Sequence, residues 1–184
     1  MDATRRTLLT RVRGRGDPRA WKEFVGLYRS LVGRYARARG LSAADAKDVA
    51  ADCMDALAEH VASPDYDPSG GRFKRWLRGL VRAALRERAE AASVAPDSER
   101  QSHAEPTPDE VFERIWGDEH LRHCLEQLRI EVEFKTFEAF RRLALDQWPV
   151  ERVCETYDLT PQYVCAMKSR LTQRLRRLMQ SLLG

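Results

Sequence analysis

The sequence predicts an all-α protein built from two small helical domains, and three observations support this. Apolar residues recur every three to four positions along most of the 184 residues, whereas alternating β-branched runs are nearly absent. Residues 91–108 are rich in serine, proline and acidic residues, which indicates a flexible acidic linker. The C-terminal segment has the pattern of two helices joined by a short turn. We therefore expect one domain over residues 1–90 and a second over residues 109–184.

Composition and charge distribution favour a folded protein that binds a polyanion. Hydrophobic residues make up 43% of the chain and charged residues 33%, which is typical of a globular protein. The formal net charge is only +4, but basic residues gather toward both ends and acidic residues dominate between positions 97 and 133. Two cationic regions of this kind make nucleic acid the first candidate partner.

Several classes of protein are not expected. The chain has no run of about 18 apolar residues and no apolar signal segment at its start, so we expect a cytoplasmic protein without a membrane contact. The four cysteines form no CxxC pair and are expected to be buried. His120, His123 and Cys124 lie close together, but no further ligand has metal-site spacing, so neither a metal nor a cofactor is expected. No nucleophile motif accompanies the four histidines, and an enzyme is therefore not expected.

The first domain is expected to contain three helices. The first covers residues 18–39 and ends at Gly40, a favourable C-terminal cap. Ser42 caps the second, which runs to about residue 60, and the third covers residues 72–92. The second helix carries four aspartates at helical spacing, which form one acidic ridge. This ridge would repel DNA and favours a protein partner, although an ordinary solvated face would have the same pattern. The ridge consists of Asp45, Asp48, Asp52 and Asp55.

The third helix combines a row of arginines with two aromatic residues. The arginines recur at steps of three and four and therefore share one face of the helix. Phe73 and Trp76 lie near the start of this row. Such a combination suits single-stranded nucleic acid, because arginines bind its phosphate backbone and unstacked bases stack on an aromatic ring. Alternatively, both aromatic residues belong to the core. The arginines are Arg75, Arg78, Arg82 and Arg86.

The second domain is expected to end in a helix-turn-helix. In that motif Thr160 caps the last helix and Pro161 occupies its first turn. Asp158 stands in the turn, where a positive φ is often required. The expected helices cover residues 109–128, 132–146, 149–157 and 161–182.

The last helix offers an outward face that is suited to duplex DNA. Its side chains are able to reach base edges in a major groove or to bind phosphates. An ordinary helical hairpin with a solvated basic face remains the alternative. The predicted DNA-binding residues are Gln162, Tyr163, Ala166, Lys168, Ser169, Arg170, Gln173 and Arg174.

Three motifs in this order carry a resemblance to a known family. The segments "DAKDVAADCMDAL", "GRFKRWLRGLVRAALRE" and "DLTPQYVCAMKSRLTQRLRRL" together resemble a bacterial extracytoplasmic-function sigma factor. The resemblance covers the chain from about Leu8 onward. It implies a subunit that directs core RNA polymerase to promoter DNA and initiates transcription.

The resemblance also implies roles for the separate segments. Residues 45–59 match the helix that docks on the clamp helices of the largest polymerase subunit. Residues 72–88 match the segment that opens and recognises the minus-10 element, and residues 150–178 match the hairpin that binds the minus-35 element. The linker would lie in the RNA exit path. The sequence leaves open whether an anti-sigma factor binds the protein, and a stand-alone helix-turn-helix regulator or a protein-binding module remains an alternative.

The chain departs from the family pattern at several positions. Ala51 and Asp52 replace a Gln-Glu pair in the docking helix, and Met54 replaces an aromatic residue. Ala83 stands where the family commonly has an asparagine that recognises a flipped base, and Asp158 replaces the glycine of the turn. These differences bear on base preference at the minus-10 element and on polymerase affinity.

Overall fold

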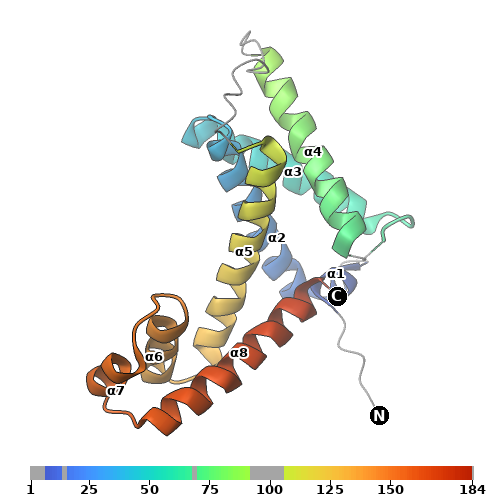
Figure 1. Cartoon of the computed structure of the whole chain (residues 1–184). Coiled ribbons are helices and arrows are strands. Elements are labelled where there is room, and N and C mark those ends of the chain that lie inside the picture. The colour runs from blue at the N-terminus through green and yellow to red at the C-terminus, as the bar shows by residue number, and fades with distance from the viewer. Residues whose placement is uncertain (1–6, 14–15, 68–69, 92–105, 184) are drawn as a thin grey trace. The chain divides into compact units, whose positions relative to one another are not determined.

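The computed structural model describes residues 7–13, 16–67, 70–91 and 106–183 (Figure 1). In these residues the regular structure is entirely helical, which confirms the predicted all-α class. The chain divides into two compact units: unit 1 comprises residues 1–120 with 182–184, and unit 2 comprises residues 121–181. Most of the predicted linker, residues 92–105, lies outside the described residues.

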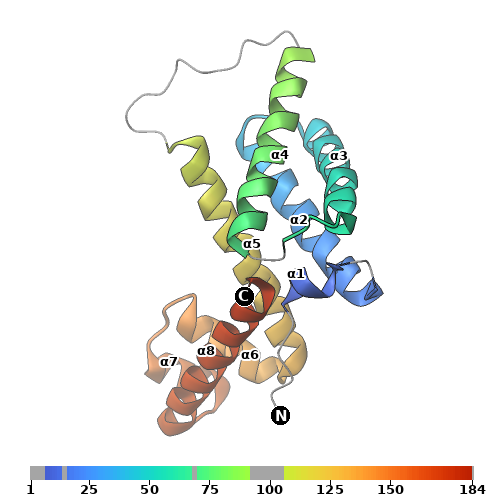
Figure 2. The same cartoon turned by 90° about the vertical axis from the view of Figure 1, so that its right-hand side faces the viewer.

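Unit 1 contains the three predicted helices and a short additional one. The additional helix, α1, has only one turn, which is too short for helical periodicity to reveal it in the sequence. α2 and α3 lie side by side, and α4 packs against α3 (Figure 2). The bounds are α1 Leu8–Arg11, α2 Pro18–Ala38, α3 Ala43–Ala62 and α4 Gly70–Ala91.

Local chemistry explains where these helices begin and end. The Asp17 carboxylate accepts hydrogen bonds from the N–H groups of Arg19 and Ala20, at 3.1 and 2.9 Å, and so caps α2. The chain leaves this helix through Gly40, whose φ of 92° is unfavourable for other residues. The Ser42 hydroxyl accepts the N–H of Asp45 at 3.1 Å and caps α3, as the sequence predicts.

Aromatic rings form the centre of unit 1. Tyr28 of α2 packs edge-on against Phe73 of α4, with ring centroids 4.9 Å apart. α5 (Pro108–Glu131) adds Phe112 and Trp116, and the Phe112 ring packs against that of Tyr35 at 5.3 Å. The first part of α5 therefore belongs to the core of unit 1.

This packing moves the division of the chain away from the predicted position. The sequence places the start of the second domain at residue 109, directly after the linker. In the structure residues 109–120 group with unit 1, and unit 2 begins at Leu121. The reason is burial: Phe112, Trp116 and His120 of α5 are 0%, 6% and 0% exposed. Composition marks the linker, but it does not show against which neighbour the following helix packs.

Unit 2 is a small helical cluster around one apolar core. It contains the rest of α5, α6 (Phe134–Ala144), α7 (Val150–Tyr157) and most of α8 (Pro161–Leu183) (Figure 2). Its core is built from buried side chains of every helix in the unit, which fixes the orientation of α8 about its own axis. The buried residues include Leu128, Phe140, Val153, Val164, Met167 and Leu171.

Candidate nucleic-acid interface

The turn between α7 and α8 has the conformation that the sequence predicts. Asp158 adopts the left-handed region with φ 48° and ψ 62°. The N–H of Leu159 donates to the carbonyl of Cys154 at 3.0 Å, which closes the end of α7. The Thr160 hydroxyl then accepts the N–H of Tyr163 at 3.3 Å and caps α8. Two helices are thus joined within three residues, and this turn determines which face of α8 points outward.

α8 has one buried and one exposed face in unit 2. Val164, Met167 and Leu171 are buried in the core, which leaves the opposite side of the first three turns in solvent. Seven of the predicted DNA-binding residues are exposed there, and only Arg174 is partly buried. The exposed residues are Gln162, Tyr163, Ala166, Lys168, Ser169, Arg170 and Gln173.

Arg174 differs from the other predicted contacts because it already has a partner. Both nitrogens of its guanidinium fork donate to the Glu131 carboxylate, and the Nε–Oε2 distance is 2.6 Å. The same hydrogen bonds lower the pKa of Glu131 below its ordinary value, so the pair is charged at neutral pH. A phosphate contact by Arg174 would compete with this pair. The sequence gives no sign of it, because the two residues are 43 positions apart.

Cys165 lies on the exposed face of α8, although the sequence predicts buried cysteines. Cys53 and Cys124 are buried as predicted, and Cys154 is partly buried. Cys165 is exposed, next to the predicted contact Ala166. The apolar series Val164, Met167 and Leu171 fixes the buried side of α8, and its register could have placed Cys165 outside it.

The arginine row of α4 is partly covered by acidic residues of α5. Arg82 pairs with Asp109 at 3.2 Å, and Arg78 lies 3.9 Å from the same carboxylate. At the ends of the row, Arg75 and Arg86 are exposed and form no ion pair with a residue that the structure describes. Arg78 and Arg82 therefore share a side of α4, and the positive charge in the middle of the predicted row is partly compensated within unit 1.

Phe73 does not lie on this face. Its side chain is 1% exposed, and the rings of Phe24, Tyr28 and Trp116 surround it, with centroids 4.9 to 6.4 Å away. A buried ring cannot stack on a base, so the prediction that Phe73 contacts the strand is not met in this structure. The core alternative applies to Phe73, because its position in the first turn of α4 points toward α2 and α5.

Trp76 is partly exposed, but one of its ring faces is occupied. The imidazole of His60 stacks on the indole, with centroids 3.7 Å apart and planes inclined by 8°. Burial lowers the pKa of His60, which favours the neutral ring in this stack. Trp76 therefore combines a structural contact with partial exposure to solvent.

The acidic ridge of α3 is divided between structural and free carboxylates. Arg88 of α4 pairs with Asp45 at 3.0 Å and with Asp48 at 3.1 Å. The hydroxyl of the cap residue Ser42 also donates to Asp45, and this bond and Arg88 lower the pKa of that carboxyl. Asp52 and Asp55 are exposed and form no ion pair with the described part of the chain. They are the members of the predicted polymerase-binding set that remain available to a partner.

The histidine and cysteine cluster that the sequence singles out has no metal-site arrangement. His120 is fully buried, where Nδ1 lies 2.6 Å from the carbonyl of Trp116 and Nε2 lies 3.3 Å from the Tyr28 hydroxyl. Within the described ranges, no group of three or more His, Cys, Asp or Glu side chains is placed to hold a metal ion.

Comparison with known proteins adds no family to these observations. No protein-family model matches the chain, and no curated protein shows significant sequence similarity to it. A separate property concerns the helices: in the residues that the structure describes, none is both long and apolar enough to cross a lipid bilayer.

Proposed function

We propose that this protein is a promoter-specificity subunit of bacterial RNA polymerase, a sigma factor that acts in the cytoplasm. The observation that carries the proposal is the exposed face of α8. Its register is fixed by a buried core and a capped turn, and it offers amide, hydroxyl and guanidinium groups to a major groove. Side chains held on a helix in this way are suited to sequence recognition in duplex DNA.

Two further surfaces support a role beyond duplex binding. α4 carries a row of arginines with a partly exposed tryptophan, which suits an unpaired DNA strand. α3 carries exposed carboxylates, Asp52 and Asp55, which suit a cationic protein surface rather than DNA. A sigma factor needs all three: a duplex contact, a single-strand contact and a polymerase contact.

A second candidate function is a stand-alone regulator that binds duplex DNA through α8 alone. One observation favours it: Asp109 pairs with the middle of the α4 row, so the row is less available than the sequence suggests. Under this alternative α4 and α3 would be structural, and core polymerase would not bind.

Capture of core RNA polymerase by the full chain separates the two functions. The sigma hypothesis predicts binding, and it predicts loss of binding in the variant Asp52→Asn/Asp55→Asn. The matched control is Asp65→Asn/Asp118→Asn, which removes two exposed carboxylates elsewhere in unit 1. If the wild-type chain does not bind core polymerase, the proposal is wrong.

Run-off transcription on a library of candidate promoters extends the test to function. The same proposal predicts promoter-dependent transcripts when the chain is added to core polymerase. An anti-sigma factor would be identified as a protein that binds the chain and abolishes these transcripts.

A further inference from the structure

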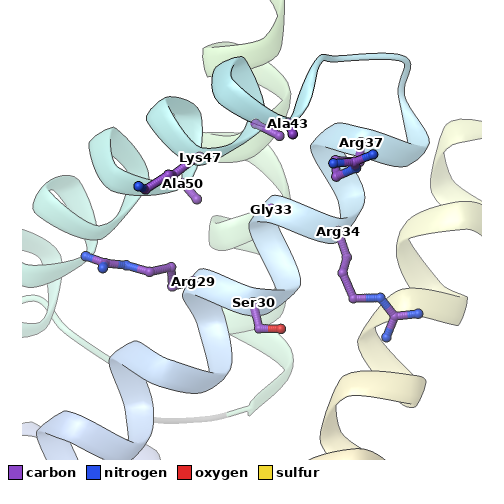
Figure 3. A pocket seen from close by; sticks show the side chains of 9 residues that line it. Arg29, Ser30, Gly33, Arg34, Arg37, Ala43, Lys47 and Ala50 are labelled. Carbon is purple, nitrogen blue, oxygen red and sulfur yellow. The ribbon is translucent and has the colours of Figure 1, made fainter.

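A groove lies between α2 and α3, with basic side chains around it and a largely apolar surface inside it. Its volume is about 270 Å³, and four basic side chains stand around it: Arg29, Arg34 and Arg37 from α2 and Lys47 from α3. Gly33 and Ala50 are among the small residues that line it. Figure 3 looks onto this groove, with Arg29 and Lys47 extending from the two helices on the same side.

Most of the positive charge around the groove is uncompensated. Arg34 pairs with the buried carboxylate of Glu119 and points toward α5 (Figure 3). Arg29, Arg37 and Lys47 are exposed, and no ion pair joins them to a residue that the structure describes. None of the described residues that line the groove is acidic. This differs from α4, where Asp109 and Glu113 of α5 lie within ion-pair distance of Arg78, and Asp109 also pairs with Arg82.

Two glycines in the middle of α2 have no explanation in the packing of the chain. Glycine destabilises a helix relative to alanine, because its backbone loses more freedom on folding. A Cβ built at Gly26 or at Gly33 meets no atom within 4 Å, so the fold does not require glycine at either position. Without a Cβ, however, an external group is able to approach the helix backbone closely. Gly33 lines the groove, one helical turn from Arg29 and one from Arg37.

The side chains of the groove favour phosphate over a protein partner. Protein interfaces depend on large apolar or aromatic anchors at their centre. Among the described residues, the strongly exposed large apolar side chains all lie outside α2 and α3. Arginine and lysine around the groove are suited instead to the oxygens of successive phosphates.

We propose that the groove between α2 and α3 binds the phosphodiester backbone of a nucleic acid. Arg29, Arg37 and Lys47 contact the phosphates, and the absence of a side chain at Gly33 lets the nucleic-acid backbone approach α2 closely. The contact carries no sequence information, since phosphates are alike, and it adds affinity to whatever the sequence-specific surfaces bind. It does not depend on the promoter role, because it requires only that the chain meets nucleic acid.

The first test measures the binding of a labelled oligonucleotide of mixed sequence, single-stranded and duplex, to the full chain over a range of salt concentrations. In Arg29→Gln/Arg37→Gln/Lys47→Gln we expect affinity to fall about ten-fold at low salt and the salt slope to fall by about 2 to 3. The control Arg19→Gln/Arg114→Gln/Lys135→Gln removes three exposed cations elsewhere that form no ion pair with any residue the structure describes. Equal losses of affinity in the two variants would mean that binding depends on the total positive charge and not on the groove, and would overturn the proposal.

The second test uses Gly33→Ala, for which stability and binding should change in opposite directions. Alanine is the better helix former and has open space here, so the melting temperature should rise by about 2–4 °C. The added methyl group should also lower the affinity for the oligonucleotide several-fold. A stabilised variant with unchanged affinity would contradict the close approach.

A third measurement separates this proposal from the sigma hypothesis. The groove variant Arg29→Gln/Arg37→Gln changes α2 alone and leaves the proposed docking helix α3 intact, so it should still capture core polymerase through α3. If it binds DNA normally but loses the polymerase, the groove is a protein site and the proposal is overturned. Failure of the wild-type chain to capture polymerase would instead count only against the promoter function.

Discussion

α4 and α8 are both basic amphipathic helices, yet they present different surfaces. Along α4, Arg78 and Arg82 lie against an acidic residue of α5, and the first aromatic residue, Phe73, is in the core. Along α8, the predicted contacts up to Gln173 are exposed. The difference shows that a basic periodic pattern marks a helix face, whereas the neighbouring helix decides how much of its charge is available.

The largest expected effect is a loss of stability, which distinguishes Phe73 of α4 from Tyr163 of α8. Phe73→Ala leaves a cavity in the core of unit 1 and should lower the free energy of unfolding by about 3–5 kcal/mol, measured by urea denaturation. Tyr163→Ala, on the exposed face of α8, should change stability little and weaken duplex binding. If Phe73→Ala remained stable but lost binding to single-stranded DNA, Phe73 would be a strand contact after all.

The next effect concerns the proposed base recognition by α8. If α8 binds a minus-35 duplex as proposed, Arg170→Ala should weaken binding to the cognate duplex by about 1–3 kcal/mol, because a contact of the guanidinium group to a base edge would be lost. Arg86→Ala on α4 should leave duplex recognition unchanged and weaken single-strand binding. Binding is compared on cognate and scrambled duplexes, and equal losses on both would reassign Arg170 to phosphate contact.

A smaller effect concerns the ion pairs between Asp109 of α5 and the arginines of α4. Asp109→Asn should release Arg78 and Arg82 and raise the affinity for single-stranded DNA about two- to five-fold at low salt, since exposed ion pairs contribute little each. Asp118→Asn makes the same charge change on α5, at an exposed position without an ion pair among the described residues. A similar increase in affinity in both variants would show that net charge, and not the ion pairs of Asp109, limits binding of single-stranded DNA.

The smallest effect concerns the ion pair between Arg174 of α8 and Glu131. Glu131→Gln should free Arg174 for a phosphate, so the slope of log affinity for duplex DNA against log salt concentration should steepen by about one. The same pair should respond to pH. Its hydrogen bonds lower the pKa of Glu131, so its contribution to stability is present above the ordinary glutamate range and is lost as the pH falls through and below that range.

The matched measurements for Glu131→Gln are salt titrations of duplex binding and thermal unfolding over a pH series. Glu126→Gln is the control, because Glu126 pairs with Arg129 on the exposed surface of α5 and not with α8. An unchanged salt slope in Glu131→Gln would mean that Arg174 contributes nothing to DNA binding.

The sequence alone determined the helices, most of their ends and the turn before α8. Periodicity, Ser42, Gly40 and Thr160 act within a few residues, so their consequences are local and visible in a single chain. The exposed face of α8 was predictable for the same reason, because Val164 and Met167 mark its buried side.

Only the tertiary structure decided which of the charged and aromatic residues are available. Burial of Phe73 requires rings from α2 and α5, and the cover of Arg82 requires Asp109 from beyond the linker. Such contacts join residues distant in sequence, and their spacing leaves no pattern. The groove between α2 and α3 is likewise a product of the tertiary structure, because its lining includes Gly33 of α2 and Lys47 of α3 and neither helix forms it alone.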